Sequence, residues 1–169
     1  MPTLPDTITT PRLRLRPLHI DDADSIARAC NDPAVARMTG TFVTPYLPQS
    51  AAFFILRQPS LQRRGLAYNW LAEADGQVLG CVGVFRATPD DTLEIGYWLA
   101  RHAWGHGFGT EMVRAIVKTT RPAQLTAKVF VDNPASLRVL EKCGFAVTGK
   151  DESHCMERQT MVKGWTLRL

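Results

Sequence analysis

The sequence lacks the features that mark membrane, secreted and metal-binding proteins. No apolar run approaches the roughly 20 residues that a membrane-spanning helix requires, and residues 1–6 carry neither the basic nor the apolar stretch of a signal peptide. The cysteines are few and far apart, with no CxxC pair and no histidine at zinc-finger spacing: Cys30, Cys81, Cys143 and Cys155. We therefore expect a cytoplasmic protein with reduced thiols, no membrane segment and no metal.

The sequence also has only a small excess of positive charge and few aromatic residues. The 20 Lys and Arg residues exceed the 16 Asp and Glu residues by only four, and aromatic residues make up 8% of the chain. A net charge of +4 favours anionic ligands such as phosphates, but it does not by itself indicate nucleic acid. Several large aromatic residues do not interleave with a basic cluster: Trp70, Tyr97, Trp98 and Trp104. Direct nucleic-acid binding is therefore not expected.

The length and composition are those of one globular domain. The chain has 169 residues, of which 45% are hydrophobic and 21% are charged. These values exclude a disordered, collagenous or coiled-coil protein, and the length suits one core better than two. We expect residues 1–169 to form a single domain, as a monomer or a homodimer.

Hydrophobic periodicity predicts alternating blocks of strands and helices. Period-two patterns and turn signals predict strands at about 12–18, 67–73, 78–85, 93–99, 125–131, 145–148 and 156–169. Helical spacing predicts helices at about 21–29, 49–64, 107–120 and 133–144, with a short helical stretch at 35–38. Turns are expected at 75–76 and 89–91, and Pro59 is expected to kink or end its helix. The sequence thus predicts an α+β (mixed α/β) fold, with a mostly antiparallel mixed sheet of about seven strands and about four helices.

Three glycines at alternate positions stand between a predicted strand and a predicted helix. Gly105, Gly107 and Gly109 allow a tight turn and a close approach of backbone to ligand. The helix that follows supplies unpaired N–H groups and the positive end of its dipole, which suit a phosphate or pyrophosphate. The pattern is not a dinucleotide fingerprint, because Thr110 stands where the third glycine would be. A β–α connection that binds no ligand remains an alternative.

A second motif opens the next predicted helix. Asn133 precedes Pro134, and Ser136 follows three residues after the asparagine. Taken alone, Asn133 is a good helix N-cap and Ser136 a polar residue of the first turn. Asn133 and Ser136 therefore indicate a function only in combination with the glycine-rich turn.

Taken together, these segments closely resemble the GNAT superfamily of acyl-CoA-dependent N-acetyltransferases, and more narrowly its branch that acetylates ribosomal-protein N-termini. The resemblance rests on the order and spacing of residues 93–99, 104–111, 133–136 and 143–145, and on residues 10–16 at the start. It extends from about residue 9 to residue 169, and the predicted order of strands and helices agrees with it.

The resemblance implies acetyl-CoA as co-substrate and assigns residues to it. The backbone N–H groups of the glycine-rich turn would cradle the pyrophosphate: Gly105, His106, Gly107, Phe108, Gly109 and Thr110. The backbone of Trp98, Leu99 and Ala100 would pair with the pantetheine arm. Asn133 would contact that arm from the opposite side, and Ser136 would lie near the thioester sulfur. Trp104 departs from the family, which often has Gln or Arg at this position.

The implied reaction is direct attack of an amine on the thioester, with both substrates bound. Glu94 is the preferred general base, acting through water, and Ser136 the preferred acid for the departing thiolate. Glu94 could instead be a solvated carboxylate or part of a structural ion pair. Other groups are weaker candidates, or border the turn without a catalytic role: Glu73, Glu111, His102 and His106.

The sequence therefore predicts an N-acetyltransferase that acts on a primary amine. A protein N-terminal α-amine is the favoured acceptor and a small-molecule amine the other candidate, with specificity in residues 41–64 and the last two strands. The reference pKa of an α-amine is near 8, so about a tenth of it is neutral at pH 7, whereas only about one lysine in 2,500 is neutral there. The alternative function is a non-catalytic acyl-CoA-binding regulatory module.

Overall fold

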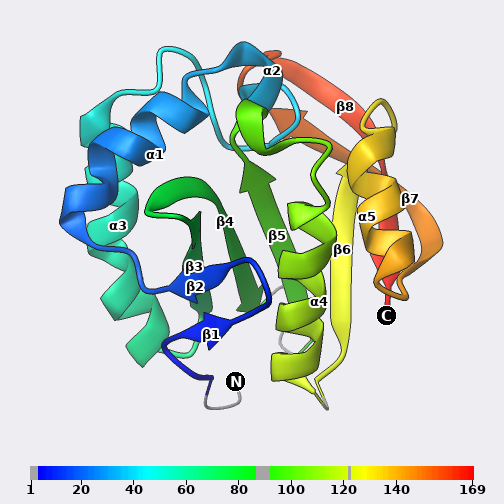
Figure 1. Ribbon diagram of the computed structural model, residues 1–169. Helices are drawn as coiled ribbons and strands as arrows, with labels where there is room; N and C mark the ends of the chain where they lie inside the picture. The colour runs from blue at the N-terminus through cyan, green and yellow to red at the C-terminus, as the bar shows by residue number, and fades with distance from the viewer. Residues whose placement is uncertain (1–3, 87–91, 122) are drawn as a thin grey trace.

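The computed structural model describes residues 4–86, 92–121 and 123–169, whose strands join in one mixed sheet (Figure 1). Its strands are β1 (Ile8–Thr9), β2 (Arg14–Arg16), β3 (Ala67–Ala74), β4 (Gln77–Arg86), β5 (Leu93–Leu99), β6 (Leu125–Phe130), β7 (Ala146–Cys155) and β8 (Thr160–Arg168). They are ordered β1-β2-β3-β4-β5-β6-β8-β7. Neighbouring strands are antiparallel except β5 and β6, which are parallel and joined through a helix. The predicted α+β class and mixed, mostly antiparallel sheet are confirmed.

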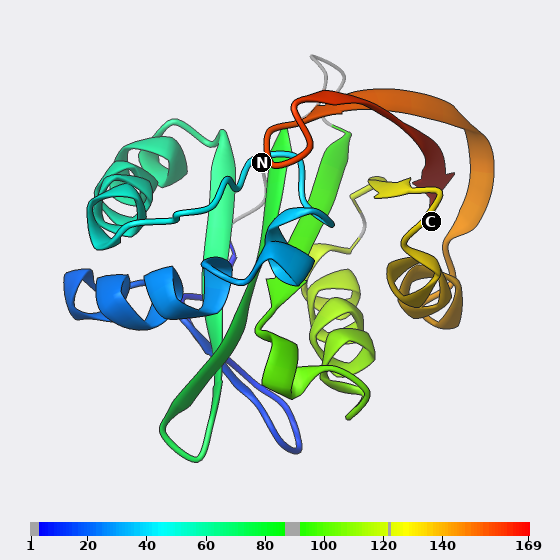
Figure 2. The same ribbon diagram turned by 90° about the horizontal axis from the view of Figure 1, so that it is seen from above.

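Helices lie on both faces of this sheet. They are α1 (Ala23–Cys30), α2 (Pro33–Ala36), α3 (Pro48–Arg63), α4 (Phe108–Thr120) and α5 (Pro134–Lys142), with 3-10 turns η1 (Ile20–Asp22) and η2 (Arg101–Ala103). Figure 2 shows α1 and α3 on one side of strands β3 to β5 and α4 on the other. In the part of the chain that the structure describes, no helix combines the length and apolarity needed to cross a membrane.

The alternation of side chains along the central strands builds two separate cores. Leu71 and Trp98 point to the face covered by α1 and α3, where they pack with Ile26. Val82 and Ile95 point to the opposite face, where the core includes the apolar side of α4. Successive residues of a strand face opposite sides, so a strand buried on both faces reads as an almost continuous apolar run.

The first strand and the last two strands differ from those predicted. Strand β1 has only two residues and carries too little pattern to be seen in the sequence. Strand β7 extends to Cys155, through a polar stretch that the sequence pattern did not assign, because its pairing with β8 holds it in extended form. Residues 156–159 form the turn between these strands, so the last strand starts at Thr160 and not at 156.

The helix that contains Pro59 does not end there. Helix α3 continues through it to Arg63, because proline removes one backbone donor but leaves the rest of the helix to be held by packing. Ala51 and Ile55 on this helix are buried. The turn expected at 89–91 lies outside the described residues.

The candidate site lies where the two parallel strands, β5 and β6, stop pairing and separate. Strand β5 pairs with β6 only at Leu93, Glu94 and Ile95. From Gly96 to Leu99, β5 keeps its partner β4 on one side and has no partner on the side of β6. The backbone of this half of β5 forms an open edge inside the sheet, and it leads directly to η2 and the glycine-rich turn (Figure 1).

Candidate active site

Each of the three glycines of the turn has a definite task. Gly105 and Gly107 both have φ of +81°, a left-handed conformation that side chains rarely adopt. A Cβ at Gly105 would meet nothing within 4 Å, so the space beside it is open. Gly109 serves packing instead, because a Cβ there would stand 3.4 Å from Val139 of α5. Gly107 is also the N-cap of α4.

The turn presents a row of backbone donors without acceptors. Among the described residues, no backbone or side-chain acceptor takes the N–H groups of residues 105–110. The first paired N–H of the helix is that of Glu111, which donates to the carbonyl of Gly107 at 3.1 Å. Unpaired N–H groups at the start of a helix, together with its dipole, form a site for an anion. The turn therefore fits a pyrophosphate group.

The open edge of β5 is shorter than the sequence suggested. The carbonyl of Leu99 accepts a hydrogen bond from the indole Nε1 of Trp104 at 2.8 Å. Ala100 has both backbone groups engaged, since its N–H donates to Leu79 at 2.8 Å and its carbonyl accepts from Ala103 at 2.9 Å. The side chain of Trp98 is buried, and alternation along the strand directs its backbone groups toward β4, as it does those of Ala100, so Trp98 offers no backbone group to this edge.

Ser136 lies at the start of α5, and its surroundings add a residue that sequence reasoning missed. The side-chain oxygen of Asn133 accepts from the N–H of Ser136 at 3.1 Å, so Asn133 is a helix N-cap, as its residue type indicated. The hydroxyl of Ser136 lies 2.8 Å from the hydroxyl of Tyr97 on β5. Burial raises the pKa of Tyr97 to about 12, which keeps it protonated at neutral pH. The signal for Tyr97 was its hydroxyl, which needs a partner when the ring is buried.

Glu94 lies on the other face of β5, three residues from Tyr97. Its pKa is raised, mainly by burial and further by the charge of Asp151, while the charge of Lys128 opposes this. Lys128 forms an ion pair with Asp151 at 3.0 Å. A half-buried carboxylate with a raised pKa suits a general base better than one held by a direct ion pair.

The two weaker candidates for the base are both held by arginine. Glu73 forms ion pairs with Arg14 at 3.1 Å and with Arg16 at 2.7 Å. Glu111 accepts hydrogen bonds from Thr10 and Arg12, and these hold its pKa below the usual value although partial burial opposes them. Both carboxylates are therefore engaged by arginine side chains.

The other sequence candidates lie at the border of the turn or in the core. His102 is an exposed residue of η2, and the exposed His106 has its ring 6.0 Å from that of Phe108. Cys30, Cys81 and Cys155 are buried, and burial raises the pKa of Cys81 to about 12. A protonated, buried thiol is a poor nucleophile. Within the described ranges, no cluster of three or more His, Cys, Asp or Glu residues could hold a metal ion.

The turn between β7 and β8 closes one end of the sheet face that carries Glu94. Glu157 accepts from the N–H and the hydroxyl of Thr44, both at 2.7 Å. Arg158 donates to the carbonyl of Arg37 at 2.9 and 2.6 Å and forms an ion pair with Asp132 at 2.9 Å. We call these contacts the β7–β8 clasp. They hold the turn against the segment that follows α2, as the ribbon of Figure 1 shows.

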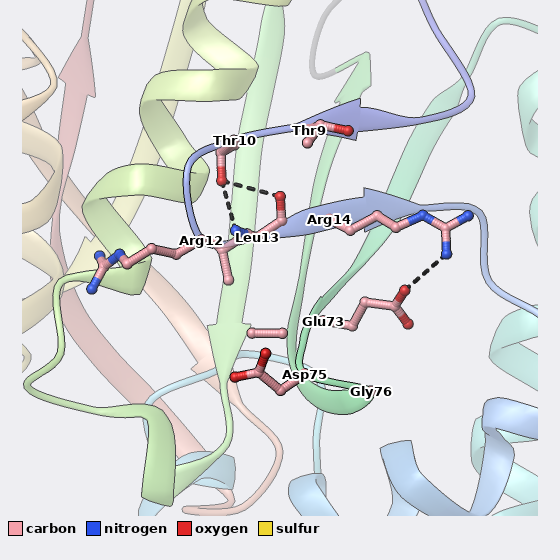
Figure 3. A pocket seen from close by; sticks show the side chains of 9 residues that line it. Thr9, Thr10, Arg12, Leu13, Arg14, Glu73, Asp75 and Gly76 are labelled. Atoms are coloured by element: carbon pink, nitrogen blue, oxygen red, sulfur yellow. Dashed lines mark hydrogen bonds and ion pairs between the residues drawn. The ribbon is translucent and has the colours of Figure 1, made fainter.

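A surface pocket of about 290 Å³ lies at the opposite end of the sheet, between the β1–β2 hairpin and the β3–β4 turn. Figure 3 shows its lining, with Asp75 and Gly76 on one side and Leu13 on the other. The predicted catalytic residues Glu94 and Ser136 are not part of its lining.

Comparisons with known proteins show the family of the chain. Residues 12–146 match the family described as acetyltransferase (GNAT) domain. The chain is 27% identical over 152 residues to the uncharacterized N-acetyltransferase p20 of Bacillus licheniformis. This alignment covers 85% of this chain and 84% of that protein. It is 29% identical over 94 residues to the ribosomal-protein-serine acetyltransferase of Escherichia coli (strain K12), over 53% of this chain and 52% of that protein.

A solved structure has a similar fold. The microcin C7 self immunity acetyltransferase MccE, in complex with acetyl-CoA and AMP, has a TM-score of 0.82 at 16% identity, over 95% of this chain and 93% of that one. The expectation of an acyl-CoA-dependent acetyltransferase with acetyl-CoA as co-substrate is confirmed by the family match. Since the matched segment spans most of the sequence, the chain belongs to the GNAT family of acetyltransferases.

Proposed function

We propose that this enzyme transfers the acetyl group of acetyl-CoA to a primary amine, preferably the N-terminal α-amine of a protein, by direct attack with both substrates bound. The relative from Escherichia coli, a ribosomal-protein-serine acetyltransferase, supports a protein acceptor. All four cysteines are free thiols, which supports a cytoplasmic location for the reaction.

The observation that carries the proposal is the row of unpaired N–H groups at residues 105–110, placed at the end of the open edge of β5. In this proposal the N–H row binds the pyrophosphate, and the edge from Gly96 to the N–H of Leu99 pairs with the pantetheine arm. Ala100 takes no part, because its backbone groups are already engaged. This arrangement directs the thioester toward the region between Glu94 and Ser136.

The acceptor enters on the face of the sheet that carries Glu94. Glu94, Lys128 and Asp151 share the surroundings of this face, and their charges sum to −1 when all three are ionised. Such a surface attracts a protonated amine before reaction. The β7–β8 clasp borders the same face and holds the segment after α2 in place. A small-molecule amine fits the same chemistry, so it stays in the experiment as the second acceptor class.

Acetyl-CoA supplies an activated acyl group as a thioester. Glu94, through a water molecule, accepts the proton that the acceptor ammonium must lose, and the neutral nitrogen then attacks the acyl carbon. Backbone N–H groups near Trp98 or Leu99 stabilise the negative charge on the oxygen. The carbon–sulfur bond breaks, and Ser136 donates a proton to the sulfur. Tyr97 holds the serine hydroxyl and passes a proton to it. The second proton that the nitrogen loses as the amide forms goes to water, and water returns a proton to Tyr97. The net products are the amide, the free thiol and one proton, which leaves from Glu94. An α-amine needs less help from the base than a lysine does.

The test is a panel of acceptors assayed by release of the free thiol and by mass spectrometry of the product. Peptides with a free N-terminus are compared with the same peptides Nα-blocked, with polyamines and with aminoglycosides. We expect acetylation of free N-termini only, and intersecting initial-rate patterns as for a ternary complex. Acetylation confined to polyamines or aminoglycosides would overturn the protein acceptor. Coenzyme binding without turnover on any amine would favour the non-catalytic module.

A further inference from the structure

The hairpin between β1 and β2 reaches the glycine-rich turn through a single side chain. The Nε of Arg12 forms an ion pair with Glu111 of α4 at 2.7 Å, and its Nη1 donates to the carbonyl of His106 at 2.9 Å. Its guanidinium also lies over the ring of Phe108, 4.6 Å from the ring centre. Residues 10–12 are about 100 positions away from this turn in the sequence, so only the fold brings them together.

The carboxylate of Glu111 accepts three hydrogen bonds from this hairpin. The hydroxyl of Thr10 donates to it at 2.6 Å, the N–H of Arg12 at 2.9 Å and the side chain of Arg12 at 2.7 Å. Arg12 is thus the only residue that contacts both the carbonyl of the turn and the carboxylate of the helix, among the described residues. We call Thr10, Arg12 and Glu111 the hairpin clamp.

The hairpin clamp offsets the negative charge of Glu111 at the start of α4. A carboxylate in the first turn of a helix is favourable for the helix itself. Here it stands within one turn of the N–H row, where it would repel a pyrophosphate. Arg12 neutralises this charge by direct contact and leaves the donors at residues 105–110 without local opposition.

The clamp also restricts the conformation of the turn. Gly105 and Gly107 make the turn tight but also intrinsically flexible, since glycine adopts many backbone conformations. Arg12 holds the carbonyl of His106, which lies between these glycines, and packs on Phe108 directly after them. A turn held from both sides loses less conformational freedom when an anion binds.

We propose that Arg12 is a positioning residue for the coenzyme: it sets the conformation and the charge of the turn that binds the pyrophosphate, with Thr10 and Glu111 as its anchors. This inference rests on the proposed role of residues 105–110. It gives the N-terminal hairpin a function in coenzyme binding, although the hairpin lies at the far edge of the sheet from β6.

The chain offers a matched control in the same hairpin. Arg14 is also an arginine of this hairpin with an ion pair to a glutamate, Glu73, but it points away from the turn (Figure 3). Arg12 extends in the opposite direction, toward α4. Both Arg12→Ala and Arg14→Ala therefore remove a guanidinium group from this hairpin, but only Arg12→Ala breaks the hairpin clamp.

The test measures the affinity of CoA by calorimetry, and turnover with acetyl-CoA and with acetyl-pantetheine, which lacks the pyrophosphate. We expect Arg12→Ala to weaken CoA binding by about tenfold or more and to raise KM for acetyl-CoA with little change in kcat. Turnover with acetyl-pantetheine should stay unchanged. Arg14→Ala should leave all these values near those of the wild type. In the Arg12→Ala background, Glu111→Gln should restore several-fold of the lost affinity, since the carboxylate is then no longer left uncompensated.

Three results would overturn the inference. They are equal CoA affinity of Arg12→Ala and the wild type, equal losses in Arg12→Ala and Arg14→Ala, or an equal loss of turnover with acetyl-pantetheine. If Arg12→Ala does not fold, Arg12→Lys keeps the charge but loses the two-sided contact, and it should weaken CoA binding by a smaller factor. A wild-type protein that does not bind CoA would instead contradict the proposed function itself.

Discussion

The hydroxyl of Tyr97 lies 2.8 Å from the hydroxyl of Ser136, and this contact joins the open half of β5 to the first turn of α5. It crosses the gap that opens where β5 and β6 stop pairing. A partly buried tyrosine with a raised pKa keeps its proton, so the pair has a proton to donate at neutral pH. Only the fold brings these two hydroxyls together.

Substitution of this pair should affect turnover more than coenzyme affinity. We expect Ser136→Ala to lower kcat by about tenfold to 100-fold, at the low end for general acid catalysis because a thiolate is a tolerable leaving group. Tyr97→Phe should lower kcat in the same direction by a smaller factor. The double variant should be no slower than Ser136→Ala, since both act through one proton. Kinetics together with CoA calorimetry check this, and additive losses would show that the two residues act separately.

Replacement of Glu94 should separate activity from stability. Because the pKa of Glu94 is raised in the folded protein, ionising it lowers the free energy of unfolding as pH rises from below its unfolded pKa through its raised folded value. Glu94→Gln removes that penalty, so at pH 7 the variant should melt at the same temperature or higher. Its turnover should fall by about 100-fold or more at pH 7, and the loss should ease as the amine loses its proton at higher pH. A loss that is constant across pH would exclude Glu94 as base.

The neighbours of Glu94 should move the acid limb of the pH profile in opposite directions. Lys128 lowers the pKa of Glu94 and Asp151 raises it. Lys128→Met should therefore shift the acid limb of kcat to higher pH, and Asp151→Asn should shift it to lower pH. The comparison uses saturating substrates and one acceptor throughout. Shifts of the same sign in both variants would contradict this account.

Two glycines that share a left-handed backbone conformation, only one of them in the glycine-rich turn, allow a test of the coenzyme site. Gly105 has φ of +81° and Gly76, in the β3–β4 turn, has φ of +74°, and a Cβ at either would meet nothing within 4 Å. Alanine should cost about 1–2 kcal/mol of unfolding free energy at each position. Only Gly105→Ala should also weaken CoA binding, because only it distorts the N–H row. Denaturation and calorimetry measure both effects, and equal CoA affinity in the two variants would remove this turn from the coenzyme site.

The β7–β8 clasp should matter for the acceptor and not for the coenzyme. Arg158→Ala removes the bonds to Arg37 and Asp132, so the segment after α2 gains freedom. We expect a several-fold increase in KM for the acceptor with KM for acetyl-CoA unchanged. Arg28→Ala, which loses only a bond to Ser25 on the same helix, is the control. An unchanged acceptor KM in Arg158→Ala would place the acceptor elsewhere.

Local patterns in the sequence were enough to identify most elements and the glycine-rich turn. The glycines at 105 and 107 read as a tight turn because only glycine adopts their left-handed conformation readily, and the structure has both at φ of +81°. The central strands were readable because they are buried on both faces. Strand β7 was not, because a polar edge strand takes its conformation from its partner.

The sequence by itself determined the fold class, the family and the backbone conformations that depend on glycine and asparagine, since these follow from local sterics and spacing. Only the tertiary structure decided which side chains meet. Tyr97 with Ser136, and Arg12 with Glu111, are contacts over 39 and 99 positions. Their proximity depends on the pairing of strands and the packing of helices, which no local pattern contains. The same contacts decided that Glu73 and Glu111 are held by arginines, which leaves Glu94 as the preferred base.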